Sequence, residues 1–233
     1  GLADQVRRML PAATVYDISD TPSSLVEASD EAAARIRAQW RQKDDEVVIA
    51  YVGSFAVYQG VALMFEAMPE VLGLHPEARF VVIGGTPDEI AARRQWLADR
   101  QAAHAVTFPG KVPPDDLPNY LRAADILLSP RLAGVNTPLK LLDYLKVGRP
   151  IVATDTRANR LILDESVAFM TGTTPAGFAA GIARLMDEPA LRASLGEAGR
   201  RLIDTRYNFA GFKQRLEECY QRLDPNQGGG IQA

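Results

Sequence analysis

Short, uninterrupted runs of apolar residues alternate with segments of helical periodicity along most of the chain. Residues 47–52 are apolar throughout and end at Gly53, whereas residues 61–72 repeat apolar side chains every three or four positions. Such alternation is typical of a parallel sheet that helices cover on both faces. The chain is therefore predicted to have an α/β fold with a doubly wound parallel sheet of about six strands. The expected strands are 47–52, 79–83, 105–108, 126–129, 150–154 and 166–170.

Helical segments lie between these strands and follow the last of them. Proline, threonine or asparagine marks several helix starts, where these residues fit the first turn or cap it. The pattern becomes wholly helical after the last strand, so the fold is predicted to end in a helical extension. The expected helices are 61–72, 87–100, 117–123, one that begins at Thr137 or Pro138, and then 175–186, 189–205 and 208–223.

Residues 1–45 differ in kind from the rest of the chain. They contain one candidate short strand at 14–18, then Thr21-Pro22-Ser23-Ser24 and a charged helix from about 30 to 42. This segment is predicted to be an interdomain connection that leads into the sheet. The predicted divisions after it are a sheet domain at 46–205, a closing helix at 206–224 and a disordered tail at 225–233.

Composition and charge exclude several classes of protein. Lys and Arg number 26 against 29 Asp and Glu, a balance that argues against a general nucleic-acid binder. No apolar run approaches the roughly 18 residues that span a bilayer, and no secretory signal pattern is present. The single Cys219 fits a reducing cytosol, and the isolated His75 and His104 form no metal-ligand cluster. The chain lacks an initiator Met and is expected to be a piece of a longer protein.

A glycine-bounded loop follows the first predicted strand, at the end of the sheet where open parallel sheets bind ligands. It runs from Gly53 to Gly60 and includes Ser54 and Gln59. Its glycines allow a close approach of the backbone, and its amides could face a pyrophosphate. The loop is neither a Walker loop nor a dinucleotide GxGxxG motif, which disfavours a P-loop NTPase or an NAD enzyme. An ordinary turn is the alternative.

Two more turns follow strands at the same end of the sheet. Residues 84–86 follow the second strand, and a plain turn accounts for them as well as a ligand does. After the third strand, backbone groups around Lys111 could contact a base edge while Val112 packs on its face, although apolar packing alone would give the same residues. Asp125, in contrast, lies at the opposite end of the sheet and is expected to be structural.

The helix after the fourth strand carries the strongest candidate chemistry. Thr137, next to Asn136, can cap that helix, and Pro138 suits its first position. Lys140 then falls in its first turn, where the helix dipole disfavours a cation, so an anion such as a phosphate is expected in front of it. Asp143, one turn later, could accept two hydrogen bonds from a ribose diol; a solvated acid is the alternative.

In this order and spacing the motifs resemble those of the carboxyl-terminal, donor-binding half of GT-B glycosyltransferases of the family 4 (group 1) type. The resemblance covers about residues 47–223. It rests on Tyr51-Val52-Gly53 with Tyr58-Gln59-Gly60, Gly110 with Leu117-Pro118, Ala124-Asp125-Ile126, the proline–lysine–acid helix, Gly148-Arg149-Pro150-Ile151-Val152-Ala153-Thr154 and Arg206-Tyr207-Asn208-Phe209.

The resemblance implies a Rossmann-like domain that binds a nucleoside diphosphate sugar, with no essential metal or other cofactor, and sugar transfer with retention. It implies a partner domain on the amino-terminal side that binds the acceptor and is absent from this chain. It also implies a cytoplasmic protein, and leaves open a peripheral association of the intact protein with the inner face of the membrane. Lys140 and Asn136 would be its catalytic residues. The implied donor-binding residues are Gly53, Ser54, Gln59, Gly60, Lys111, Val112, Asn136, Thr137, Leu139, Lys140 and Asp143.

The chain departs from the family pattern at three positions. Ser54 and Gln59 stand where the family commonly has basic residues, and Val135 stands where it often has an acid, a role that Asn136 could take over. Lys140 is then the clearest remaining cation for a diphosphate. Two alternatives stay open at this point: a nucleotide-binding or scaffold module that has lost catalysis, and half of a GT-B epimerase or phosphorylase.

Overall fold

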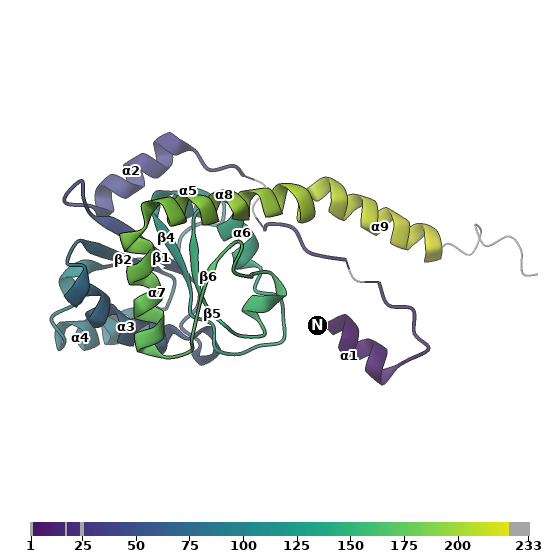
Figure 1. Ribbon diagram of the computed structural model, residues 1–233, viewed down its shortest axis with the longest axis horizontal. Coiled ribbons are helices and arrows are strands. Elements are labelled where there is room, and N and C mark those ends of the chain that lie inside the picture. Colours follow the sequence, from purple (N-terminus) through teal and green to yellow (C-terminus); the bar gives the residue numbers. More distant parts are fainter. Residues whose placement is uncertain (1, 17, 24–25, 224–233) are drawn as a thin grey trace, which may run out of the picture.

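The computed structural model describes residues 2–16, 18–23 and 26–223 of the chain. Within these residues six strands form a single sheet in the order β3-β2-β1-β4-β5-β6 (Figure 1). Every neighbouring pair in this sheet is parallel, which confirms the predicted architecture. The strands are β1 (Val47–Val52), β2 (Ala78–Ile83), β3 (Val106–Gly110), β4 (Ile126–Ser129), β5 (Ile151–Thr154) and β6 (Phe169–Thr171).

The strand β1 explains why the strands are continuous apolar runs rather than alternating ones. Ile49 and Tyr51 pack into one cluster of buried side chains, and Val48 and Ala50 into another. Both faces of the sheet are therefore covered, so no position on the strand favours a polar residue. The strand order also reverses at β1, between β2 and β4. In such sheets ligands bind beyond the carboxyl ends of the strands at this reversal.

Helices form a layer on each face of the sheet (Figure 1). Residues of α3 and α7 join the cluster of Ile49 and Tyr51, and residues of α5 and α6 join the cluster of Val48 and Ala50. The helices are α1 (Leu2–Met9), α2 (Asp30–Trp40), α3 (Val61–Leu74), α4 (Pro87–Ala98), α5 (Leu117–Ala123), α6 (Lys140–Lys146), α7 (Pro175–Asp187), α8 (Pro189–Arg206) and α9 (Phe209–Leu223).

The amino-terminal segment differs from its prediction. Residues 14–16 and 18 form no strand, so the strand expected at 14–18 is wrong. These residues pair with neither edge strand of the sheet, β3 or β6, so their short alternation of apolar and polar side chains does not produce a strand. The helix α1 is not among the predicted elements. Figure 1 shows it apart from the sheet, and its Met9 is 71% exposed.

The helix α2 ties this segment to the sheet. Ser29 caps it by accepting a hydrogen bond from the Ala32 N–H at 3.3 Å. Arg37 then donates to the carboxylate of Asp125 at 2.6 Å, and the same carboxylate accepts from the Val48 N–H at 2.8 Å. Asp125 therefore holds the starts of β1 and β4 together, and its expected structural role is confirmed.

The carboxyl-terminal extension is helical, as predicted. Asn208 accepts a hydrogen bond from the Gly211 N–H at 2.8 Å at the start of α9, which confirms it as a cap. In Figure 1, α9 continues from α8 beyond the sheet. The tail predicted at 225–233 lies outside the described residues. Among the helices of the described ranges, none combines the length and the apolar character that crossing a membrane requires.

Candidate functional site

Two loops meet beyond the carboxyl ends of β1 and β4. The first runs through the 3₁₀ turn η1 (Val57–Gln59), and the Leu132 N–H in the second donates to the Tyr58 carbonyl at 3.0 Å. Gly60 has a φ of +69°, and a Cβ there would lie 1.7 Å from the Pro130 carbonyl oxygen. The close backbone approach expected at Gly60 therefore occurs, but toward Pro130 of the second loop.

Lys140 and Gln59 come together where these loops meet. Lys140 is the first residue of α6, and its Nζ donates to the Val52 carbonyl and to Gln59 Oε1, both at 3.2 Å. The same Nζ lies 4.4 Å from the centroid of the Tyr51 ring. Desolvation by these neighbours, assisted by the charge of Arg131, lowers the pKa of Lys140 to about 7. The ammonium is thus held at the end of β1 and is readily deprotonated.

Arg131 is a second cation at this place and was missed by the sequence analysis. It is 8% exposed, and its guanidinium lies 5.4 Å from the centroid of the Tyr58 ring. Its Nε donates to the Ala133 carbonyl at 2.9 Å. Gly134, with a φ of +125°, packs so closely that a Cβ would lie 2.1 Å from an Arg131 terminal nitrogen. Its position just after a strand is the signal that could have identified it.

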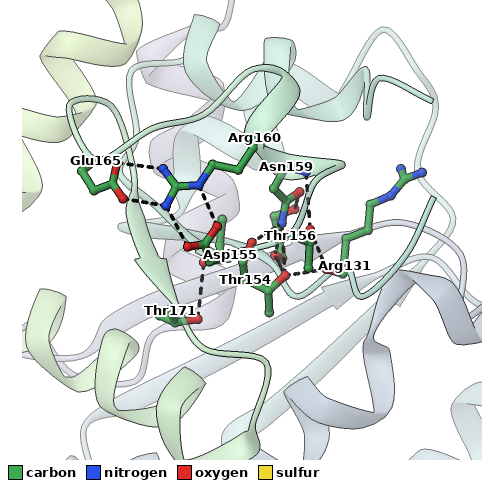
Figure 2. A network of polar contacts seen from close by, with 10 residues as sticks. Arg131, Thr154, Asp155, Thr156, Asn159, Arg160, Glu165 and Thr171 are labelled. Atoms are coloured by element: carbon green, nitrogen blue, oxygen red, sulfur yellow. Dashed lines mark hydrogen bonds and ion pairs between the residues drawn. The ribbon is translucent and has the colours of Figure 1, made fainter. Parts of the chain in front are cut away.

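A buried polar network fixes the backbone at Arg131 (Figure 2). Asn159 is fully buried, and its Nδ2 donates to the carbonyls of Ser129 at 3.2 Å and Thr154 at 2.9 Å. The Thr154 hydroxyl in turn donates to the Arg131 carbonyl. In Figure 2 the side chain of Arg131 points away from this network. The network therefore anchors the start of the second loop while the guanidinium extends toward Tyr58.

The start of α6 differs from the prediction. The helix begins at Lys140 with no side-chain cap, so the capping role expected for Thr137 is wrong. The Leu141 N–H donates to the Pro138 carbonyl at 2.9 Å, which closes a tight turn ahead of the helix. Asn136 and Thr137 consequently lie in the loop. Thr137 lines a separate hollow of about 280 Å³, together with Ser19, Asp20, Val135 and Arg206 among others.

A pocket of about 590 Å³ opens at the carboxyl ends of β1, β2 and β3. It brings together four predicted donor-binding residues: Gly53, Ser54, Lys111 and Val112. It does not include Gln59, Gly60, Asn136, Thr137, Leu139, Lys140 or Asp143, although a Cβ on Gly53 would lie only 3.4 Å from Lys140 Nζ. The pocket also contains Gly84, Gly85 and Thr86, the turn for which a ligand role and a plain turn were equally good explanations. Its other lining residues are ones that the sequence analysis did not select, namely Val52, Phe55, Ala56, Ile83, Glu89, Pro114 and Leu117.

Asp143 is covered by the amino-terminal segment. The Ser23 N–H donates to Asp143 Oδ1 at 2.8 Å, and the Ser23 hydroxyl donates to Oδ2. The side chain is buried, so the alternative of a solvated acid is wrong. Next to Asp143, Tyr144 is fully buried, and its hydroxyl oxygen accepts a hydrogen bond from the Val52 N–H at 2.9 Å. Burial raises the pKa of this hydroxyl above its usual range.

The candidate site is thus an open pocket beside two cations at the strand-order reversal. Across the described ranges, no group of three or more His, Cys, Asp or Glu side chains could hold a metal ion. The arrangement can accept a flat apolar group in the pocket and an anion near Lys140.

Comparisons with known proteins agree with this geometry. Residues 46–188 match the family model described as glycosyl transferases group 1. Over 226 residues the chain is 25% identical to alpha-D-kanosaminyltransferase from Streptomyces kanamyceticus, a match that covers 94% of this chain and 58% of that protein. The chain spans 49% to 58% of the length of such curated relatives.

Solved structures with the same fold include Anabaena Alr3699/HepE in complex with UDP and glucose. Its TM-score is 0.75 at 16% identity, covering 85% of this chain and 54% of that one. The C-terminal domain of the group 1 family protein LpcC from Francisella tularensis gives a TM-score of 0.66 at 20% identity, covering 82% of this chain and 100% of that one. Because the family model covers more than half of the residues, this chain belongs to the glycosyl transferases group 1 family, as its carboxyl-terminal domain of GT-B type.

Proposed function

We propose that this chain binds the nucleoside diphosphate sugar of a retaining, metal-independent glycosyltransferase. The observation that carries the proposal is the position of Lys140, whose ammonium lies beside Gly53, a residue that lines the pocket. An ammonium that is partly desolvated and has only neutral hydrogen-bond partners is favourably placed to receive an anion. HepE, which has this fold, was solved with UDP and glucose, and supports a nucleotide ligand.

The pocket would hold the base of the nucleotide, and Lys140 would bind its diphosphate. Val112 lines the pocket beside Lys111 and could pack on a base face while the backbone meets its edge. Lys140 would then stabilise the charge that develops on the departing diphosphate. Asn136, in the exposed loop ahead of α6, would face the sugar, and the acceptor would be held by a further domain of the intact protein. Peripheral membrane association of that protein belongs to the same proposal.

A thermal-shift screen of UDP, GDP, ADP and their sugars tests this function. A ligand that binds the folded chain raises its melting temperature by mass action. We expect one nucleoside diphosphate to protect the wild type and to protect Lys140→Met much less. Lys213→Met is the matched control, since Lys213 lies on the exposed α9 and pairs with Glu217. Equal protection of all three proteins, or of none, contradicts the proposal.

One observation favours a second candidate, a scaffold that kept the fold and lost turnover. The carboxylate of Asp143 is already hydrogen-bonded by Ser23, and Ser54, Gln59 and Val135 provide neither a cation nor an acid. An activity assay on the intact protein distinguishes the enzyme from the scaffold. An enzyme releases the nucleoside diphosphate from its sugar donor in the presence of an acceptor, whereas the scaffold binds nucleotide and leaves every donor intact.

A further inference from the structure

Arg131 and Lys140 flank one short turn. The guanidinium of Arg131 lies over the Tyr58 ring, and the ammonium of Lys140 bonds the side chain of Gln59, the next residue of η1. Across the described ranges of the chain, no carboxylate forms an ion pair with either cation. Two positive charges that lie near each other and are partly shielded from water repel each other. An anion bound between them offsets that repulsion.

We propose that Arg131 is the second cation of this anion site and binds the same diphosphate as Lys140. This inference rests on the proposed function for the nature of the ligand, and on the geometry for the site itself. Arg131 would supply what Ser54 and Gln59 cannot, since neither carries a charge. The donor site then draws its two cations from the loop after β4 and from the start of α6, rather than from the loop after β1.

The guanidinium of Arg131 has N–H donors that could bind a ligand. A guanidinium has five N–H donors, and the structure uses the Nε–H of Arg131 for the Ala133 carbonyl at 2.9 Å. Within the part of the chain that the structure describes, no hydrogen bond from its two terminal nitrogens is found. These nitrogens carry the paired donors that bind phosphate oxygens in bidentate fashion. Arg131 is only 8% exposed, so its charge is largely shielded from solvent.

The fold holds the guanidinium rigidly enough for this role. The Tyr58 ring lies on it, and Gly134 leaves room for it that no larger residue could give. The Thr154 hydroxyl and the Thr156 hydroxyl both donate to the Arg131 carbonyl, which fixes its backbone (Figure 2). Arg131 also interacts electrostatically with Lys140, because its positive charge helps to lower the pKa of that lysine.

Isothermal titration with inorganic pyrophosphate and with UDP, GDP and ADP tests the inference. Arg131→Met keeps an apolar stem over Tyr58 and removes the charge, and we expect it to weaken pyrophosphate and the preferred nucleotide by about 10- to 100-fold. Arg131→Lys restores a charge without the bidentate fork, so we expect an intermediate loss. The corresponding nucleoside, which lacks phosphate, should bind the wild type and Arg131→Met equally.

Arg94→Met is the matched control, because Arg94 also lies over an aromatic ring, 5.1 Å from the centroid of Phe108, on α4. It should bind pyrophosphate like the wild type. The inference is overturned if Arg131→Met keeps full affinity for pyrophosphate, or if the wild type binds none. If the wild type binds pyrophosphate through Arg131 but no nucleoside diphosphate, the proposed function fails while the anion site stands.

Discussion

Ser23 donates two hydrogen bonds to Asp143, one from its backbone N–H at 2.8 Å to Oδ1 and one from its hydroxyl to Oδ2. A ribose diol would offer the same carboxylate the same two donors. The buried carboxylate leaves little room for both, so a ribose on Asp143 requires Ser23 to move. The segment before α2 thus competes with the sugar of the nucleotide in our account.

Ser23→Ala tests this competition. Removing the hydroxyl deletes a hydrogen bond that the nucleotide has to displace, so we expect UDP, GDP or ADP to bind about 2- to 10-fold more tightly. Ser166→Ala is the control, because the Ser166 N–H and hydroxyl also both donate to one carboxylate, that of Asp164. Weaker binding by Ser23→Ala would instead show that Ser23 supports Asp143.

The affinity for a nucleoside diphosphate should fall as the pH rises above about 7. Lys140 has a pKa of about 7 in the free protein, against 10.5 for an ordinary lysine. Only the protonated ammonium attracts the diphosphate, so the affinity is highest below this pKa and binding above it takes up a proton. Titration from pH 7 to 9 measures the effect, and Lys140→Met should abolish it. An affinity that is constant over this range contradicts the assignment.

The same lysine affects the stability of the free chain. Between pH 7 and 10.5 the unfolded state holds a proton on Lys140 that the folded state has lost. Because the unfolded state binds more protons, the contribution of Lys140 to the free energy of unfolding rises with pH across this window. Urea unfolding of the wild type and of Lys140→Met should therefore differ in slope against pH. Parallel curves would show that the folded chain keeps this lysine protonated.

Gly60→Ala should destabilise the fold by about 2 kcal/mol or more, since its Cβ would meet the Pro130 carbonyl and its φ is positive. Gly73 offers the opposite control. It lies in α3 with no atom within 4 Å of an added Cβ, so Gly73→Ala should stabilise by about 0.5–1 kcal/mol. Urea unfolding measures both. Equal effects of the two substitutions would exclude the contact with Pro130 as the cause.

Asn159→Ala should cost about 2–4 kcal/mol of stability, because the buried Ser129 and Thr154 groups lose their partners. We also expect weaker pyrophosphate binding, since the network fixes the backbone of Arg131. Asn119→Ala removes a hydrogen bond to the Ser29 N–H on the exposed side of α2 and should cost about 1 kcal/mol or less. A stable Asn159→Ala protein with full binding would contradict the role of the network.

The sheet could be predicted because its strands are buried on both faces. That burial makes 47–52 and 126–128 continuous apolar runs, and the strands 47–52 and 126–129 have the expected bounds. The start of α6 could not be predicted in the same way. Thr137 and Pro138 suit a helix start, but the tight turn at Pro138 delays the helix to Lys140.

Contacts between distant segments limited the prediction of the site. Sequence position placed Gln59 in the loop after the first strand and Lys140 in the first turn of the helix after the fourth. Only the fold shows that their side chains bond each other. The hydrogen bond from Ser23 to Asp143 joins residues that are 120 positions apart, so no local sequence pattern indicates it. Arg131 was overlooked because no motif marks it, and its importance comes from the burial that the loop after β4 creates.

A crystal structure of the chain with its preferred nucleoside diphosphate tests the central claim most directly. The account predicts phosphate oxygens within hydrogen-bond distance of Lys140 Nζ, and the base in the pocket beside Val112. It is contradicted if the nucleotide lies elsewhere while Lys140 keeps its bonds to the Val52 carbonyl and to Gln59.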